Sequence, residues 1–306
     1  MKSFKKILVA LDHTDIDKEL IKAASFISTL AKSEEVRFIN VIKNTNIPEH
    51  IKKEFPNLME DALKDRNKEI ALKVDQHFEN DSCKTIIEIT SGQPTKCILK
   101  YSAGKNTDLI IMGRKNEKKG GGVLIHRVAR RAGCSLLIIP RGYNKKVNKI
   151  LVPIDYSDHS LDSVNQLIEL SEDKIPKVKL VPQHVYQVPS GYHYAGKSFN
   201  DFGKIMEENS IKEYEAFKTK FKETDLDIEP IFTLDREEDV ISTIYKTAKK
   251  IRANAIVIGA KGVTSTSALF LGSSAEKLIQ LDSEIPLFVM RARGKQKGII
   301  EYLLKL

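Results

Sequence analysis

The sequence of 306 residues lacks the marks of a membrane-spanning or secreted protein. Its apolar runs fall well short of the roughly 18 to 20 residues that a membrane span needs. The opening residues Met1–Lys6 lead straight into the strand-like segment Ile7–Val9, without the apolar core of a signal peptide. There are only 3 cysteines, and an odd number argues against a closed disulfide framework. We therefore expect a cytoplasmic protein in a reducing environment.

Motifs of several enzyme classes are also missing. The sequence has no P-loop of the form Gly-x4-Gly-Lys-Ser/Thr and no Gly-x-Ser-x-Gly nucleophile elbow. It has no His-Ile-Gly-His run and no Ser-Gly-Gly-x-Asp-Ser pyrophosphatase loop. The 7 histidines are scattered, and none has the spacing of a metal site. The sequence therefore predicts neither a catalytic residue nor a metal ligand.

The basic charge lies in one half of the chain. In total, 50 Lys and Arg outnumber 41 Asp and Glu, which gives a net charge of +9. Residues 1–146 hold 28 basic and 18 acidic side chains, a net of +10, whereas the remaining residues hold 22 and 23, a net of −1. A basic total often indicates nucleic-acid binding. Here no aromatic residues are interleaved with the charges and no nucleic-acid-binding motif is present, so nucleic acid is the least favoured partner.

The chain is an internal repeat with a period of about 145 residues, the size of a whole domain. Three apolar segments of the first half recur in the second. The pairs are Lys6–Asp12 with Lys149–Asp155, Asp108–Gly113 with Asn254–Gly259, and Ser135–Ile139 with Pro286–Met290. We predict domains at residues 1–144 and 147–294, followed by a C-terminal tail at 295–306.

Each copy alternates short, continuous apolar runs with helical patterns. Such runs are typical of strands buried on both faces of a parallel sheet. One example of a helical pattern is the long charged amphipathic segment Leu58–Phe78. The order predicts an α/β fold of two tandem doubly wound, Rossmann-like domains, each with a parallel sheet of about five strands. We further predict that the last strands, Leu136–Ile139 and Leu287–Met290, pair across a pseudo-two-fold axis, because each would otherwise be an exposed edge.

The strongest candidate site follows a buried strand of the second copy. Gly259 ends the strand Ala255–Gly259, Gly262 follows, and after nine residues come Gly272 and Ser273, which opens a helix. Glycine lets a ligand approach the backbone, and the amides at a helix N-terminus favour an anion. A structural alternative is that Ser273 and Glu276 form a capping box. Taken alone, the pattern leaves phosphate binding and simple capping equally open.

The spacing Gly259-x2-Gly262-x9-Gly272-Ser273 resembles the nucleotide-binding signature of the universal stress protein family. The segment from Lys149 to Ser157 is similar to that family's first strand and loop. With the duplication, the resemblance covers essentially the whole chain, as a tandem member. It implies an adenine nucleotide alpha hydrolase-like fold and, in many members, bound ATP.

The resemblance also implies roles for individual residues. Phosphates and ribose would be held by Gly259, Gly262, Gly272, Ser273 and the amides of Ser274 and Ala275. Asp155 would reach the ribose, the base or a phosphate-bound Mg²⁺, and the adenine would be lined by Pro153, Val185 and Ile258. Independently of the resemblance, a carboxylate just past a strand can accept hydrogen bonds from ribose hydroxyls or hold a metal ion. The alternative for Asp155 is the N-cap of the next helix.

The first copy departs from the signature. Compared with the second copy, Asn116 replaces the second glycine and Val123 stands where the serine should be. The loop between them is about four or five residues shorter than in the second copy. ATP binding of the family type is therefore doubtful in this copy. Basic residues gather here: Arg114, Lys115, Lys118, Lys119, Arg127, Arg130 and Arg131, against Glu117. They form either a solvated basic face or, in the alternative, an altered anion site or a docking surface for an acidic partner.

The leading hypothesis is a regulatory protein of the stress response that holds ATP, with or without Mg²⁺, in its second copy and turns over little or none. One alternative is a weak Mg²⁺-dependent ATPase. Another is a non-enzymatic interaction module whose basic first copy docks an acidic partner. The sequence leaves a homodimer open, and no membrane contact is expected.

Overall fold

The computed structural model describes residues 4–42, 48–114, 121–143, 147–171, 178–261, 271–281 and 283–291. The chain divides into two compact units, Met1–Lys145 and Lys146–Leu306. Their boundary falls within the short link between the two sequence repeats.

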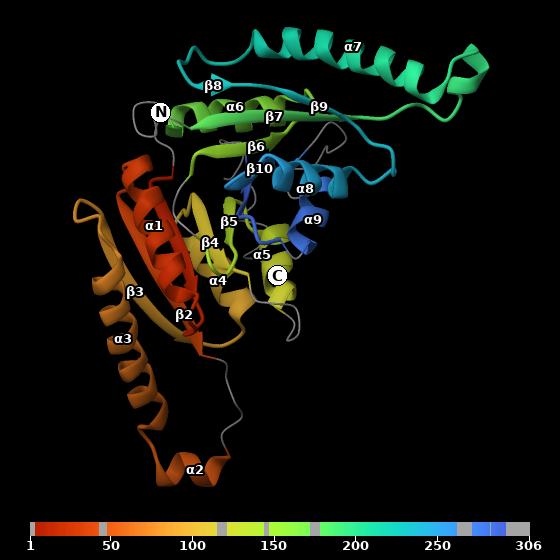
Figure 1. Ribbon diagram of the computed structural model, residues 1–306. Helices are drawn as coiled ribbons and strands as arrows, with labels where there is room; N and C mark the ends of the chain where they lie inside the picture. Colours follow the sequence, from red (N-terminus) through yellow and green to blue (C-terminus); the bar gives the residue numbers. More distant parts are fainter. Residues whose placement is uncertain are drawn as a thin grey trace. The chain divides into compact units, whose positions relative to one another are not determined.

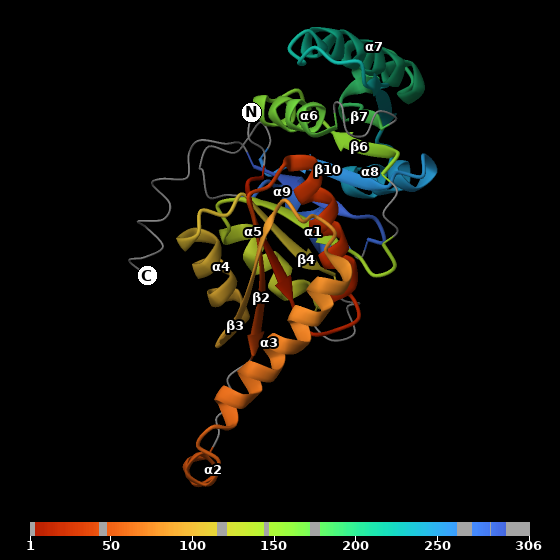
Figure 2. The ribbon, with the colours of Figure 1, turned by 90° about the vertical axis from the view of Figure 1, so that its left-hand side faces the viewer.

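The first unit is a parallel sheet in the order β3-β2-β1-β4-β5. Its strands are β1 (Lys6–Leu11), β2 (Glu35–Ile42), β3 (Lys84–Ser91), β4 (Leu109–Gly113) and β5 (Ser135–Ile139). Its helices are α1 (Asp17–Ala31), α2 (Glu49–Glu54), α3 (Leu58–His77), α4 (Pro94–Gly104) and α5 (Gly121–Arg131). Helices α1 and α3 pack together on one face, and α4 and α5 on the other (Figures 1 and 2).

The central strands of this sheet are buried on both faces, as their apolar sequences require. Ile7, Leu8 and Val9 of β1 are each at most 2% exposed, and Leu109, Ile110 and Ile111 of β4 are fully buried. The core therefore lies on both sides of β1 and β4, and the loops at their carboxyl ends are left to form a site.

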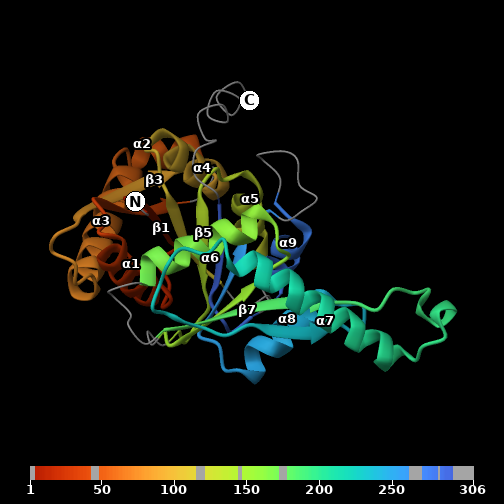
Figure 3. The ribbon, with the colours of Figure 1, turned by 90° about the horizontal axis from the view of Figure 1, so that it is seen from above.

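The second unit repeats this plan in the order β11-β10-β6-β7-β8, with β9 also paired to β7. Its strands are β6 (Lys149–Pro153), β7 (Lys179–Tyr186), β8 (Asp227–Ile228), β9 (Ile231–Leu234), β10 (Ala255–Gly259) and β11 (Leu287–Met290). Its helices are α6 (Asp158–Ser171), the 3₁₀ helix η2 (Tyr192–Ala195), α7 (Phe199–Lys218), α8 (Val240–Lys250) and α9 (Ser273–Gln280). Helices α6 and α7 lie over one face of the sheet (Figure 3), and α8 contacts α9.

The outer strand of the second unit differs from the expected five-strand plan. In the first unit β3 runs unbroken along β2 over eight residues. In the second unit the same position is filled by two pieces, β8 and β9, both parallel to β7. Pro230 lies between them and has no N–H to donate to the ladder, so the strand is interrupted there.

The predicted fold class, two tandem doubly wound α/β domains, is confirmed. The predicted helix Leu58–Phe78 is α3, which ends one residue earlier at His77. The tail at 295–306 lies outside the described residues. Among the helices that the structure describes, none combines the length and the apolarity needed to span a membrane. The pairing of the two last strands across a pseudo-two-fold axis stays a prediction.

Candidate functional site

A pocket of about 270 Å³ opens at the carboxyl ends of β6, β7 and β10 in the second unit. Ligands of open α/β sheets bind at this edge. The pocket is lined by Pro153, Ile154, Asp155, Ser160, Gln183, His184, Val185, Val240, Ile244, Ile258, Gly259, Lys261, Gly272, Ser273, Ser274 and Ala275. It therefore brings the strand ends, the loop after β6 and the start of α9 into one site.

Helix α9 presents its N-terminus to this pocket. Its N-cap is Gly272, and the first bond of the helix runs from the Glu276 N–H to the Gly272 carbonyl at 2.9 Å. The amides of Ser273, Ser274 and Ala275 therefore precede the first intrahelical bond. Because the cap residue is a glycine without an accepting side chain, the capping-box alternative for Ser273 is wrong. A helix start of this kind suits an anionic ligand.

Two hydrogen bonds fix the chain just after β10, one to the end of β11 and one to the start of α9. The Ala260 N–H donates to the Met290 carbonyl at 2.6 Å, and the Gly272 N–H donates to the Ala260 carbonyl at 2.7 Å. Gly259, one residue earlier, is closely surrounded. An added Cβ would lie 3.1 Å from the His159 carbonyl oxygen. The glycine at the strand end thus lets the chain pass close to α6 before it returns to the pocket.

Asp155 is fixed by the first turn of α6 and does not cap it. The cap is Ser157, whose Oγ accepts from the Ser160 N–H at 3.2 Å and whose carbonyl accepts from the Leu161 N–H at 3.0 Å. Asp155 Oδ1 accepts from the Ser157 N–H at 3.2 Å and from the hydroxyls of Ser157 and Ser160. The N-cap alternative for Asp155 is therefore wrong. The carboxylate is exposed and pre-oriented at the rim of the pocket.

His184 supports the same loop from β7. Its Nδ1 lies 3.2 Å from the Ile154 carbonyl oxygen, and its ring stacks on Tyr156 with centroids 4.3 Å apart. Because burial disfavours the charged imidazole, the pKa of His184 lies below its ordinary value. The neutral ring therefore carries its proton on Nδ1 and donates it to the carbonyl.

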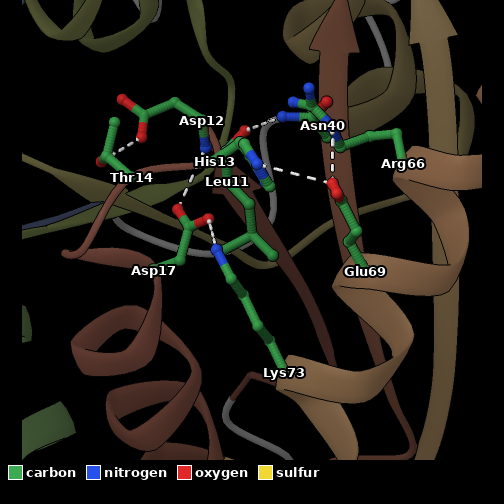
Figure 4. A network of polar contacts seen from close by, with 9 residues as sticks. All are labelled: Leu11, Asp12, His13, Thr14, Asp17, Asn40, Arg66, Glu69 and Lys73. Atoms are coloured by element: carbon green, nitrogen blue, oxygen red, sulfur yellow. Dashed lines mark hydrogen bonds and ion pairs between the residues drawn. The ribbon is translucent and has the colours of Figure 1, made fainter. Parts of the chain in front are cut away.

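The loop after β1 in the first unit is built in the same way (Figure 4). The Asp12 N–H donates to Asp17 Oδ1 at 3.1 Å, as the Asp155 N–H donates to Ser160 Oγ, five residues ahead, at 3.1 Å. His13 and Tyr156, each directly after the aspartate, both have left-handed backbones, with φ of 61° and 60°. The two loops thus share one geometry with different side chains.

Two side chains that support the first loop, Asn40 of β2 and Asp17 at the start of α1, show how the chemistry differs between the copies. Asn40 Nδ2 donates to the Leu11 carbonyl at 2.9 Å, which is the bond that His184 makes in the second unit. Asp17 is fully buried, with Lys73 Nζ at 3.5 Å (Figure 4). Burial raises the pKa of Asp17 above its ordinary value, although the Asp12 amide and Lys73 oppose this shift.

The first unit also has a pocket beside this loop, of about 600 Å³. Asp12, Arg66, Val123 and Arg127 are among its lining residues. Val123, predicted to stand where the second copy has its serine, is 52% exposed in the first turn of α5, which begins two residues earlier at Gly121.

The predicted basic face of the first unit is only partly a surface. Arg114 is 7% exposed, and its backbone N–H donates to the Ile139 carbonyl at 2.8 Å. Arg127, Arg130 and Arg131 are exposed, as a solvated face requires. The other charged residues of the group, residues 115 and 117–119, lie outside the described residues, as does the second glycine position at 116.

The structure brings nine of the ten predicted site residues to one pocket, and Gly262, the tenth, lies outside the described residues. Sequence reasoning missed Ser160, Gln183, His184 and Lys261. One available signal was the repeat itself, because Ser160 stands five residues after its aspartate, as Asp17 does. Gln183 bonds Thr233 of β9 and Thr247 of α8, and a contact between such separate elements is not visible in any local spacing of the sequence.

These features define a class of protein: a tandem pair of doubly wound α/β units, one with a glycine-bordered pocket at a helix N-terminus. The universal stress protein family matches the chain over residues 3–140 and 146–291. The chain therefore belongs to the universal stress protein family.

Individual relatives agree with this assignment. Universal stress protein MJ0531 of Methanocaldococcus jannaschii is 26% identical over 144 residues, which covers 45% of this chain and 83% of that protein. Among solved structures, a universal stress protein from Archaeoglobus fulgidus has a TM-score of 0.64 at 19% identity and covers 94% of this chain and 98% of its own. A putative universal stress protein from Pseudomonas aeruginosa has a TM-score of 0.65 at 15% identity, with 99% and 98% covered. These two structures support the fold alone.

Proposed function

We propose that the second unit binds ATP and acts as a regulatory module with little or no turnover. The observation that carries this proposal is the pocket in which the end of β10, the start of α9 and Asp155 meet. Phosphates would bind Ser273 and the amides of Ser274 and Ala275, because these amides precede the first intrahelical bond. Lys261, which also lines the pocket, would add a positive charge beside them.

The remaining lining residues suit the other parts of the nucleotide. Asp155 would accept from ribose hydroxyls, with or without a phosphate-bound Mg²⁺ nearby. Pro153, Val185 and Ile258 would line the adenine with apolar surface. The amides, the carboxylate and the apolar side chains that line the pocket therefore fit the three parts of a nucleotide. They lie at the ends of strands and at the start of a helix.

Slow or absent turnover follows from the state of Asp155. Among the described lining residues, Asp155 is the one carboxylate. Its Oδ1 accepts from the Ser157 amide and from two serine hydroxyls. Because three donors engage Oδ1, the carboxylate is committed to holding the loop and is poorly placed to take a proton from water. We expect release of ADP at the background rate in wild type and in Asp155→Ala. Release above background that Asp155→Ala abolishes would establish the ATPase alternative.

Calorimetry of the full chain with ATP tests the binding proposal. Gly272 has φ −63° and ψ 149°, which any residue adopts, so Gly272→Val adds no backbone strain and would place a branched side chain beside the amides at the start of α9. Loss of two hydrogen bonds to a charged phosphate, each about 1.5–3 kcal/mol, predicts a Kd at least about a hundredfold higher. cAMP belongs in the same titrations, since another universal stress protein has been crystallised in complex with it.

The matched control is Gly122→Val, the corresponding change in the first copy. Gly122 directly precedes Val123, as Gly272 precedes Ser273, and a Cβ there meets nothing within 4 Å. This variant should keep the ATP affinity of wild type. Wild-type affinity in Gly272→Val, or loss of affinity in Gly122→Val, would show that the site is elsewhere.

A second candidate function concerns the first unit. Its larger pocket has two arginines, Arg66 and Arg127, among its lining residues, in a half of the chain with a net charge of +10. We propose that this unit holds an anionic ligand or an acidic partner through guanidinium groups, in place of the amide site. Arg127→Ala, which removes an exposed member of the pocket, should weaken binding of such a ligand and leave ATP binding unchanged. Inorganic phosphate and an acidic peptide are suitable first ligands, and equal binding of both by wild type and variant would refute the proposal.

A further inference from the structure

The floor of the second pocket contains a buried amide whose oxygen has no partner in the described part of the chain. Gln183 of β7 is 0% exposed and lines the pocket beside Val185. Its Nε2 donates to Thr233 Oγ1 at 3.1 Å and to Thr247 Oγ1 at 2.9 Å. Its Oε1 has no hydrogen-bond partner among the described residues. The amide is therefore held at its nitrogen end, and no described residue supplies a donor to its oxygen.

The position of this amide matches the predicted adenine wall. Gln183 is the register partner of Pro153, and Val185 lies two residues further along the same strand. Residues two apart on a strand share a face of the sheet, so Gln183 and Val185 face the same side. Pro153 and Val185 are two of the three residues expected to line the adenine. Gln183 thus lies where the base of a nucleotide would rest.

The first copy shows that the fold does not need this amide. There, Ala10 occupies the place of Pro153, and its register partner on β2 is Ile39. Ile39 is 1% exposed and fills the equivalent position with an apolar side chain. A buried acceptor without a donor is unfavourable, so an amide in place of an isoleucine calls for a ligand that supplies the donor.

We propose that Gln183 determines the base specificity of the site by accepting a hydrogen bond from the exocyclic amine of adenine. This inference rests on the proposed ATP binding. Adenine carries one amino group as its N–H donor, at position 6, whereas guanine carries an oxygen acceptor there. Oε1 facing position 6 therefore selects 6-aminopurine nucleotides and repels 6-oxopurine nucleotides. The two threonines position the amide by holding its nitrogen away from the ligand.

The test compares ATP with inosine triphosphate, in which an oxygen replaces the amine at position 6. We expect full-length wild-type protein to bind ATP about 10 to 100 times more tightly, because the 6-oxo analogue leaves the buried acceptor without a donor. In Gln183→Leu the affinities for the two nucleotides should come within about threefold of each other, because leucine has no amide oxygen to accept from the amine. The control is Gln187→Leu. Gln187, four residues along, bonds Asp235 Oδ2 at 3.0 Å and is not among the lining residues, so its variant should keep the wild-type ratio.

The outcomes separate this inference from the proposed function. Equal binding of the two nucleotides by wild type, or an unchanged ratio in Gln183→Leu, overturns the role of Gln183 and leaves ATP binding intact. Absence of any nucleotide binding in wild type overturns both. If Gln183→Leu does not fold, a crystal structure of the wild-type protein with ATP decides. A distance from Gln183 Oε1 to the adenine amine within hydrogen-bond range supports the assignment, and a base that lies elsewhere refutes it.

Discussion

Replacement of His184 by asparagine should remove a pH dependence from the second unit while keeping one hydrogen bond. Asn40 makes the corresponding bond in the first unit, from Nδ2 to the Leu11 carbonyl at 2.9 Å. The asparagine in His184→Asn can therefore donate to the Ile154 carbonyl as the imidazole does, at 3.2 Å in wild type. Unlike the imidazole, it does not titrate. The change thus separates the hydrogen bond from the charge.

The sign of the pH effect follows from the burial of the ring. The pKa of His184 is lowered from 6.5 by burial, which outweighs the opposing effects of the Ile154 hydrogen bond, Glu213 and Asp155. Above pH 6.5 both folded and unfolded states are neutral, and the stability that the neutral ring contributes is fully present. As the pH falls below 6.5, the unfolded state binds a proton first, and the stability declines until the folded-state pKa is reached. The slope cannot exceed about 1.4 kcal/mol per pH unit for one group.

The stack on Tyr156 sets the cost of the change at neutral pH. The rings lie 4.3 Å apart and 26° from parallel, a geometry worth about 0.5–1.5 kcal/mol. We expect His184→Asn to be less stable than wild type by about this amount at pH 7.5. The difference should shrink as the pH falls below 6.5, because only wild type then loses stability.

Native-state hydrogen exchange of the amides of β7 measures this in the intact chain, since it reports opening of the second unit separately from the first. Amides of β2 serve as the internal control and should respond equally in both proteins. An NMR titration of His184 at or above pKa 6.5, or an unchanged gap between variant and wild type from pH 7.5 to 5.5, would refute the reasoning.

Two further predictions concern the loops that shape each site. Asp17→Ala should destabilise the first unit by about 1–3 kcal/mol in urea unfolding, because the Asp12 N–H loses its acceptor, whereas Asp17→Ser should recover most of this loss. Equal losses in the two variants would contradict that explanation. Gly259→Val should cost about 1–3 kcal/mol and weaken ATP binding, since an added Cβ lies 3.1 Å from the His159 carbonyl oxygen. Gly104→Ala, where a Cβ meets nothing within 4 Å, should be neutral or stabilising, and a melting temperature equal for both glycine variants would count against the steric argument.

The sequence predicted those features that depend on local pattern. The repeat of Lys6–Asp12 as Lys149–Asp155 placed the first strand of each copy and its terminal aspartate. The glycine spacing located the return of the chain at Gly272. It did not show that Gly272 itself is the cap, because a capping box and a glycine cap give the same letters. The break in the outer strand at Pro230 was readable from the sequence only once that strand was known to pair with β7.

The residues that sequence reasoning missed depend on contacts between elements. Gln183 is fixed by threonines on β9 and α8, 50 and 64 residues away along the chain. His184 is fixed by the loop after β6, 30 residues away. Each would pass as an ordinary polar residue in a strand, and only the register of β7 against its neighbours gives it a role.

The two copies differ most where a ligand would be read and least where the loop is held. In both, the aspartate after the first strand is followed by a residue with a left-handed backbone. The N–H of the aspartate donates to a side chain five residues further along the chain. These supports tolerate an exchange of Asp17 for Ser160. By contrast, the second copy has Ser273 at the start of α9 and Gln183 at the pocket floor. The aligned residues of the first copy are Val123, in the first turn of α5, and Ile39 of β2. Val123 and Ile39 are apolar, so their side chains offer no hydrogen bond to a phosphate or a base. The first copy carries the net charge of +10, and the anion site proposed there would use Arg66 and Arg127, the two arginines that line its pocket.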